Sequence, residues 1–271
     1  MASTHYTRSD LAEALNAVGV RAGDTIFSHS NIGFFGIPET ATNSDEACAL
    51  ILEAVMDVLG DQGTLVVPTF TYSFPDGLIF DPDHTPSRCG AFTEYVRLHP
   101  QAQRSHDPCV SVAAIGALAD KLTTDVPVNA YGSESFAARF FDANGRICNF
   151  NLDAGSTLIH FVERELEVPY RFDKEFQGVR RIDGEYHDTV SILWVRRLVD
   201  GTEADFTFFD LLARQRRLFH TAPVGRGQVG SITAASTRDL IGLILSEHPR
   251  FLTRAGLTGK MSALMIEVAS K

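Results

Sequence analysis

The sequence predicts an α/β protein with a mixed central sheet flanked by helices and a smaller antiparallel β excursion around residues 170–235. Up to about residue 170, short apolar strand patterns alternate with amphipathic helical patterns, which favours a sheet covered on both faces. From residue 179 two alternating segments flank Gly184, which is typical of an antiparallel hairpin. No linker or low-complexity tract divides the 271 residues, so we expect one domain over 1–271, with 170–235 as its candidate subdomain.

Each element follows from a local pattern of apolar, capping and turn residues. Thr7 precedes an apolar stripe that predicts a helix over 7–18, and Ser44 precedes another that ends at Gly60, where a left-handed C-cap belongs. Further helices are expected over 91–98, 133–144, 156–167, 206–218 and 237–246. Strands are expected over 25–29, 64–70, 109–115 and 146–150, and hairpin arms over 179–183 and 186–195.

The composition argues against several classes of protein. With 24 Lys+Arg against 34 Asp+Glu the formal net charge is −10, and no basic cluster offers a surface for nucleic acid. No apolar run has the length of a membrane span, and the N-terminus lacks the apolar core of a secretory signal, so we expect a cytoplasmic protein. The 4 cysteines lie far apart without C-x-x-C spacing, so neither structural zinc nor a disulfide framework is expected.

The most informative segment is 153–165. On a helix starting near residue 156, His160 and Glu163 are i,i+3 neighbours, and Thr157 lies one turn nearer the N-terminus on the same ridge. A carboxylate beside an imidazole fixes its tautomer and raises its basicity, and free N–H groups of a first helical turn favour negative charge. These parts can deprotonate an amine and stabilise a developing oxyanion. From spacing alone, a surface His–Glu pair without chemistry is the commoner interpretation.

A second segment, 28–36, follows a strand and is rich in small and hydroxyl residues. Such a loop exposes backbone N–H groups and admits a phosphate or a pantetheine chain, although an ordinary polar turn around His29 explains the same pattern. In the loop 104–111, Arg104 is a candidate phosphate partner. Metal ligation by His106 and Asp107 lacks the usual ligand spacing, and Ser133 or Ser135 is interpreted as a helix cap.

Seven short motifs, in order, resemble those of the aminoglycoside 3-N-acetyltransferase family, the larger fold distinct from the common small N-acetyltransferase superfamily. The similarity covers about residues 8–175 and continues more loosely to the C-terminus. The motifs are His29-Ser30-Asn31-Ile32…Gly36, Gly63 to Phe70, Thr85-Pro86-Ser87…Gly90…Glu94…Arg97, Arg104-Ser105…Pro108…Ser111-Val112…Gly116, Tyr131-Gly132…Ser135, Gly145-Arg146-Ile147 and Thr157…His160…Glu163.

The resemblance implies transfer of an acetyl group from acetyl-CoA to a primary amine of an aminoglycoside or related amino sugar, as in antibiotic resistance. The amine attacks directly in a ternary complex, without a covalent enzyme intermediate or a metal. His160 and Glu163 match the family's active-site pair in its T-x-x-H-x-x-E segment, with His160 as general base and Thr157 as an oxyanion donor. The acceptor is a small molecule, with no nucleic-acid or membrane partner, and a homodimer is left open.

Binding residues are expected in two groups. The acetyl-CoA contacts are expected at His29, Ser30, Asn31, Phe34, Gly36, Arg104, Ser105, His106, Ser111 and Val112. The acceptor contacts are expected at Tyr72, Glu94, Tyr131, Asp153 and Asp173. The acidic members of the second group would supply the negative field that a cationic acceptor prefers.

Some positions depart from the family pattern. Asn31 stands where the family usually has a second serine, Asp107-Pro108 stands where it commonly has His-Pro, and 179–218 matches poorly. Three other functions therefore remain open: acyl transfer to a different biosynthetic amine, hydrolysis by three histidines around a metal or water, and CoA binding without catalysis. The three histidines of the second alternative are His29, His106 and His160.

Overall fold

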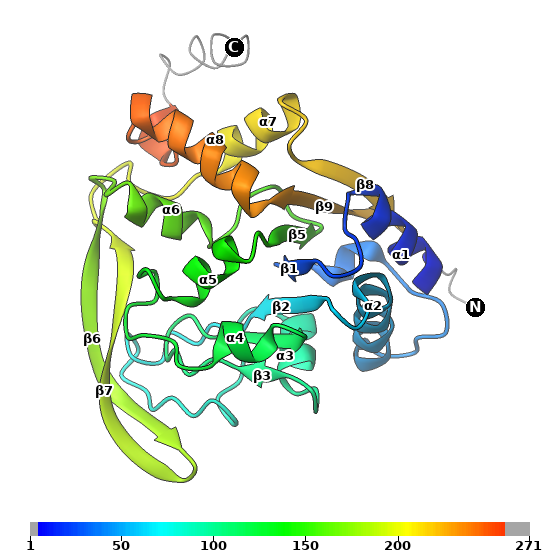
Figure 1. The fold of residues 1–271 in the computed structure, drawn as a ribbon, viewed down its shortest axis with the longest axis horizontal. Helices are drawn as coiled ribbons and strands as arrows, with labels where there is room; N and C mark the ends of the chain where they lie inside the picture. Colours follow the sequence, from blue (N-terminus) through cyan, green and yellow to red (C-terminus); the bar gives the residue numbers. More distant parts are fainter. Residues whose placement is uncertain (1–4, 258–271) are drawn as a thin grey trace.

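The computed structural model describes residues 5–257, and its centre is a seven-stranded mixed sheet (Figure 1). The strand order is β3-β4-β2-β1-β5-β9-β8. The strands are β1 Thr25–Phe27, β2 Thr64–Pro68, β3 Gln103–Arg104, β4 Val112–Gly116, β5 Arg146–Phe150, β8 His220–Val224 and β9 Gly227–Thr233. β1 pairs in parallel with β2 and β5, and the outer pairs are antiparallel. The predicted mixed α/β architecture is confirmed.

Helices cover both faces of this sheet. Because strand side chains alternate, Phe27 and Val66 belong to one core, whereas Ile26 and Leu65 belong to the other. The first core is covered by α4 Ala119–Thr123, α5 Phe136–Asp142, α6 Ile159–Glu165, α7 Thr207–Gln215 and α8 Ala234–Glu247. The second is covered by α1 Arg8–Ala17, α2 Ser44–Leu59 and α3 Ala91–Arg97. No described helix is both long and apolar enough to cross a bilayer.

Capping residues explain where several helices begin and end. Thr7 caps α1 through a capping box, and Gly60 ends α2 with a φ of 61°. Ser135 caps α5 as predicted, so that helix starts after 133. Ser156 instead accepts a hydrogen bond within a turn, and α6 begins only at Ile159, later than predicted. Thr157 therefore stands ahead of the helix that carries His160.

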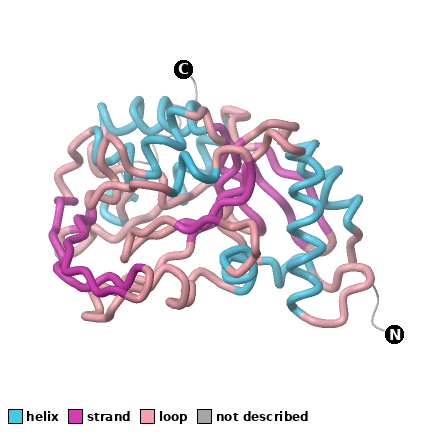
Figure 2. The backbone as a smooth tube through the Cα atoms, turned by 60° about the horizontal axis from the view of Figure 1, so that its bottom comes forward, coloured by secondary structure: helices cyan, strands magenta, loops and turns pink. Residues whose placement is uncertain are grey.

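The region 170–235 divides into two parts. β6 Arg171–Ile182 and β7 Glu185–Arg196 pair along their whole length as a separate hairpin, which projects along one side of the molecule (Figures 1 and 2). Its turn is Asp183-Gly184, with φ of 50° and 84°, as a two-residue type I′ turn requires. Residues 220–233, where the sequence analysis assigned no strand, form β8 and β9 and join the central sheet beside β5.

The carboxyl ends of β1, β2 and β5 meet at one edge of the sheet because the three strands are parallel. His29 follows β1, Phe70 follows β2, and the segment 151–157 follows β5. Ligands of open α/β sheets bind at such an edge. The hairpin begins at Arg171, directly after α6, so its base lies at the same edge.

Candidate active site

The pair formed by His160 and Glu163 lies one turn apart on α6. His160 Nδ1 lies 2.6 Å from Glu163 Oε2, the glutamate side chain is 0% exposed and the histidine side chain is 16% exposed. Because an ionised carboxylate only accepts hydrogen bonds, this contact assigns the proton to Nδ1 and leaves the lone pair on Nε2. The expected contact between the two side chains is therefore present, and Nε2 faces away from Glu163 toward Arg171, whose Nη2 lies 3.4 Å from it. We refer to these two residues as the dyad.

Two further residues hold the buried carboxylate. The Tyr170 hydroxyl donates to Glu163 Oε1 at 2.6 Å, and Arg171 Nε lies 2.8 Å from Oε2. Burial by itself raises the pKa of Glu163, but the charge that His160 carries when protonated, the charge of Arg171 and the hydrogen bonds from His160 and Tyr170 outweigh it and lower the pKa. The carboxylate thus stays ionised inside the protein.

His29 contacts Thr157 on the other side of the site. Its Nε2 accepts the Thr157 backbone N–H at 3.3 Å and lies 3.2 Å from Thr157 Oγ1. Burial, followed by repulsion from His160 in its protonated state, lowers the pKa of His29 to about 4, so the ring is neutral at physiological pH. An acceptor Nε2 requires the proton on Nδ1. His29 therefore faces Thr157 as an uncharged acceptor.

Asn149, a buried residue of β5, connects these segments. Its Oδ1 accepts the His29 backbone N–H at 3.3 Å. Its Nδ2 donates to the carbonyl oxygens of Asp153 at 2.7 Å and Gly155 at 2.8 Å. One amide thus fixes the loop that carries Thr157 against the end of β1.

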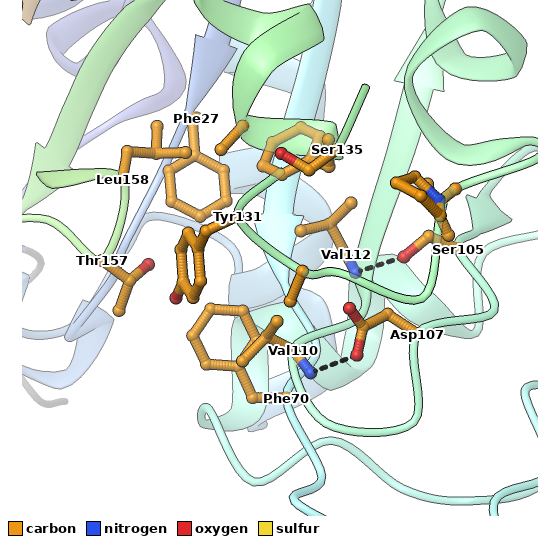
Figure 3. Close-up of a pocket in the computed structure, with 15 residues that line it drawn as sticks. Phe27, Phe70, Ser105, Asp107, Val110, Val112, Tyr131, Ser135, Thr157 and Leu158 are labelled. Atoms are coloured by element: carbon orange, nitrogen blue, oxygen red, sulfur yellow. Dashed lines mark hydrogen bonds between the residues drawn. The ribbon is translucent and has the colours of Figure 1, made fainter. Parts of the chain in front are cut away.

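A narrow pocket is enclosed by Phe27, Phe70, Thr157 and Leu158 together with the loops 105–112 and 126–137 (Figure 3). Most of its lining is apolar, including Phe27, Phe70 and Leu158, and its cavity volume is about 20 Å³, which is room for one or two waters. The polar lining residues are Ser105, Asp107, Ser135 and Thr157. His160 stands beside this pocket, with its ring centroid 5.9 Å from that of the lining residue Tyr131.

The polar lining groups are themselves anchored to backbone. Ser105 Oγ accepts the N–H of Val112, and Ser135 Oγ accepts that of Ala138, so each hydroxyl keeps a proton to donate. Asp107 Oδ1 accepts the N–H groups of Cys109 at 2.8 Å and Val110 at 2.9 Å. Burial nevertheless raises the pKa of Asp107. This carboxylate also delays the start of β4, which was expected at 109.

The structure therefore gathers one subset of the expected site residues around this pocket. That subset is His160, Glu163, Thr157, His29, Tyr131, Ser105 and Val112. Tyr72 lies at its rim, 40% exposed, with its ring 6.1 Å from that of Phe70 and a φ of 51°. Asp153 and Asp173 lie on the loop before α6 and on β6, where the first binds the Gly155 N–H and the second pairs with Arg164.

Arg104 is held by the protein itself. Its guanidinium donates to the carbonyl oxygens of Pro82, Thr85 and Thr69, and its Nε donates to the hydroxyls of Thr69 and Ser111. Burial lowers its pKa to about 10. This differs from the expected phosphate contact, because the donors that a phosphate would need are already used. The Ser111 hydroxyl likewise donates to the Thr69 carbonyl.

Other expected residues lie away from the dyad. Glu94 belongs to α3, in the opposite helical layer, where both its oxygens bind Arg97. His106 is exposed at a separate polar hollow beside Asp120 and Asp125. The loop residues Ser30, Asn31, Phe34 and Gly36 extend from β1 over the short helix η1 Ile32–Phe35, and Phe34 is 64% exposed.

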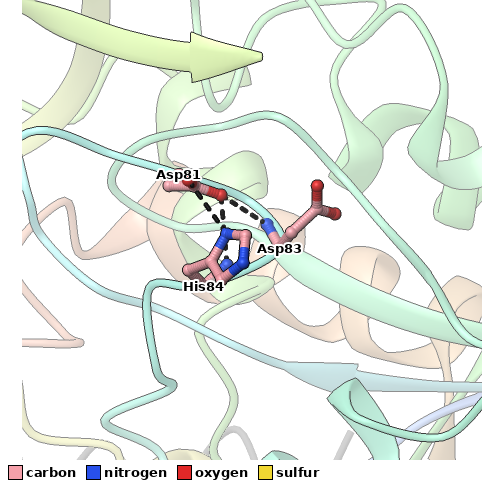
Figure 4. A group of neighbouring side chains, drawn as sticks. All are labelled: Asp81, Asp83 and His84. Atoms are coloured by element: carbon pink, nitrogen blue, oxygen red, sulfur yellow. Dashed lines mark hydrogen bonds and ion pairs between the residues drawn. The ribbon is translucent and has the colours of Figure 1, made fainter. Parts of the chain in front are cut away.

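The histidines expected at a hydrolytic metal site do not come together. Within residues 5–257 the one group of potential metal ligands is Asp81, Asp83 and His84 (Figure 4). There Asp81 binds the backbone N–H groups of the other two and pairs with Arg181, so it stabilises a surface turn. This arrangement argues against the hydrolase alternative.

Three residues of the site were not predicted from the sequence, namely Asn149, Tyr170 and Arg171, and Asp107 was considered only as a metal ligand. Tyr170 and Arg171 follow Glu163 by seven and eight positions, and only the reversal of the chain at Pro169 brings them back to it. Asn149 lies within a predicted strand, where a buried amide in an apolar run is the signal that points to a loop contact.

Known proteins resemble this chain along most of its length. The family model described as aminoglycoside 3-N-acetyltransferase matches residues 41–244. The chain is 28% identical over 268 residues to aminoglycoside N(3)-acetyltransferase VII of Streptomyces paromomycinus, covering 85% of each chain. It is 29% identical over 266 residues to aminoglycoside N(3)-acetyltransferase VIII of Streptomyces fradiae, covering 84% of this chain and 85% of that one.

Solved structures share the fold. AAC-IIIb in its binary complex with CoASH superposes with a TM-score of 0.78 at 22% identity, covering 89% of this chain and 96% of that one. AAC-VIa bound to sisomicin superposes with a TM-score of 0.77 at 23% identity, covering 90% and 99%. With the family match over more than half of its length, the chain belongs to the aminoglycoside 3-N-acetyltransferase family of acyltransferases.

Proposed function

We propose that this protein transfers an acetyl group from acetyl-CoA to a primary amine of an aminoglycoside or related amino sugar. The observation that carries the proposal is the 2.6 Å contact between His160 Nδ1 and the fully buried Glu163, beside a narrow pocket. The relatives are named for N(3)-acetylation of aminoglycosides, and AAC-IIIb was solved with CoASH. Both facts support this substrate pair.

His160 acts as the general base. Its Nε2 takes a proton from the acceptor amine, whose nitrogen forms a bond to the thioester carbonyl carbon that acetyl-CoA supplies. The carbon–sulfur bond then breaks, and the sulfur leaves as a thiolate that takes the proton from the His160 imidazolium, which restores the neutral ring. Glu163 stabilises the imidazolium while it exists and, by holding the proton on Nδ1, leaves the lone pair on Nε2, by the logic of a base oriented by a buried carboxylate.

Thr157 is the proposed oxyanion donor. Its backbone N–H is engaged by His29, and its hydroxyl lies in the pocket wall 3.2 Å from the same ring nitrogen. Because that nitrogen carries no proton, the hydroxyl donates to it in the resting protein, and we propose that the hydroxyl turns to the developing negative charge when the amine attacks. One such donor contributes about 10²- to 10³-fold to turnover.

The chemistry of the pocket lining suits the thiol arm of CoA, and the pocket would have to widen to admit it. The pocket is apolar and narrow, and Ser105 and Ser135 each keep a hydroxyl proton for a carbonyl oxygen. The loop from His29 to Gly36, with exposed Phe34, is the proposed contact for the rest of the molecule. For the acceptor we propose the rim formed by Tyr72 and Tyr131 together with Asp153 and Asp173.

Thiol release from acetyl-CoA tests the function directly. We expect release with aminoglycosides, and His160→Gln to lower it by about 10²- to 10⁴-fold. A panel that includes unrelated biosynthetic amines separates the two transferase functions. If only those amines react, they replace the aminoglycoside as the proposed acceptor. Equal turnover in His160→Gln would place the base elsewhere.

Ionic strength tests the proposed role of the carboxylates Asp153 and Asp173 in acceptor binding. A cationic acceptor attracted by carboxylates should show a KM that rises with salt, because exposed charges are screened within about 10 Å at 0.1 M. The matched comparison is the KM for acetyl-CoA in the same buffers. An acceptor KM that stays flat would remove Asp153 and Asp173 from acceptor binding.

A further inference from the structure

The Arg171 side chain touches both members of the dyad. Its Nε lies 2.8 Å from Glu163 Oε2, and its Nη2 lies 3.4 Å from His160 Nε2. Its Nη1 donates to the Trp194 carbonyl at 3.1 Å, and only 7% of the side chain is exposed. We propose that Arg171 is a positioning residue that keeps Nε2 of His160 unprotonated until the acceptor arrives. This inference rests on the proposed function, in which Nε2 is the base.

The hydrogen-bonding chemistry of the guanidinium carries this inference. A guanidinium has five N–H donors and no acceptor, so it can favourably face only the lone pair of an unprotonated Nε2. The Nδ1 proton is directed at Glu163 on the other edge of the ring. Arg171 and Glu163 thus select the same tautomer from two sides. Protonation of Nε2 would oppose two N–H groups and place two positive charges together in a largely buried site.

The other groups that face His160 act differently. Glu163 attracts a proton onto the ring, and His29, from the end of β1, is itself neutral. Tyr131 and Phe206 contact the ring with centroids at 5.9 Å and 6.0 Å and carry no charge at neutral pH. Arg171 is therefore the charge that balances Glu163. Without it, the negative charge of Glu163 alone would act on the ring and would favour a second proton at Nε2, which has to be free to accept a proton from an amine.

Nitrogen NMR of the full-length protein without substrate tests this role. The His160 signals are assigned by comparison with His160→Gln, and long-range ¹H–¹⁵N spectra report the protonation of each ring nitrogen. In the unaltered protein at pH 7 we expect a protonated Nδ1 and a free Nε2. In Arg171→Gln we expect the ring to become protonated at a pH higher by about one to three units, and in Arg171→Lys by less.

The pH profile of kcat/KM gives a second readout. In Arg171→Gln the acid limb should move to higher pH, so that activity lost at pH 7 returns at higher pH. A purely structural role would lower activity by the same factor at every pH. Arg238→Gln is the matched control. Arg238, on α8, pairs with Glu165 of α6, the helix that carries the dyad, but contacts neither member of the dyad.

Two results would overturn the inference. One is an unchanged titration of His160 in folded Arg171→Gln. The other is a protonated Nε2 in the unaltered protein at pH 7. This measurement needs no variant, so it can overturn the inference even if Arg171→Gln does not fold. If the spectra behave as expected but no amine is acetylated, the proposed function fails while the effect of Arg171 on the ring stands.

Discussion

Two histidines stand at the same edge of the sheet, and their surroundings give them opposite properties. His29, after β1, accepts a backbone N–H, and burial together with repulsion from protonated His160 lowers its pKa to about 4. His160, on α6, donates to a buried carboxylate and stays 16% exposed. The comparison teaches that the partner, rather than the residue type, decides whether an imidazole is a structural acceptor or a base.

The largest expected effect comes from removing the buried carboxylate, because this is the partner that His160 has and His29 lacks. Glu163→Gln should lower kcat by about 10⁴-fold, because the amide no longer fixes the tautomer or stabilises an imidazolium. It should also lower the free energy of unfolding by about 3 kcal/mol, since buried Arg171 loses its counter-charge. Steady-state thiol release and urea unfolding measure the two effects. A kcat within tenfold of the unaltered protein would remove Glu163 from the mechanism.

Thr157, which His29 holds, gives the next largest effect. Thr157→Val removes the hydroxyl at nearly constant volume and should lower kcat by about 10²- to 10³-fold. Thr157→Ser keeps the hydroxyl and is the matched control, with kcat close to that of the unaltered protein. If both variants turn over alike, the hydroxyl does not contribute to the reaction.

The pH dependence of stability tests His29 itself. Its pKa is lowered from 6.5 to about 4 in the folded protein, so between these values the unfolded chain binds the proton more readily. The free energy of unfolding should therefore fall by about 3 kcal/mol as the pH drops through this window. Denaturant unfolding at several pH values measures this, and His29→Gln should show a flatter profile. An equal slope in the two proteins would contradict the lowered pKa.

The smallest effect is expected at the hydroxyl that supports the carboxylate. Tyr170→Phe removes the 2.6 Å hydrogen bond to Glu163 Oε1 and should lower the free energy of unfolding by about 2 kcal/mol. The dyad contact through Oε2 remains, so kcat should fall by less than about tenfold. A loss of kcat as large as that in Glu163→Gln would show that Tyr170 has a direct part in the chemistry.

Local pattern was enough to predict part of the molecule. The strand 146–150, the hairpin around Gly184 and the i,i+3 pair of His160 and Glu163 all depend on periodicity or spacing within a few residues. β8 and β9 were missed because Pro223 and three glycines interrupt any alternation there. Their pairing with β5 comes from tertiary contacts that no short window contains.

The expected binding residues show a second limit. Arg104 and Glu94 carry charges suited to a ligand, but the sequence cannot tell whether their partners belong to the ligand or to the protein. Here the acceptors of Arg104 are mostly carbonyl oxygens of distant loops, and Glu94 binds Arg97 three residues away. Arg171 shows the converse, since a strand-initiating arginine has no local feature that indicates a buried carboxylate.

The amide of Asn149 has a consequence for how the site behaves when it changes charge. It joins the end of β1 to the loop before α6 through one backbone N–H and two backbone carbonyls, none of which ionises. Neutral groups alone therefore hold the loop that carries Thr157 beside the backbone of His29. Acid, base or added salt can alter which protons the rings carry without changing the charge of any partner of this amide.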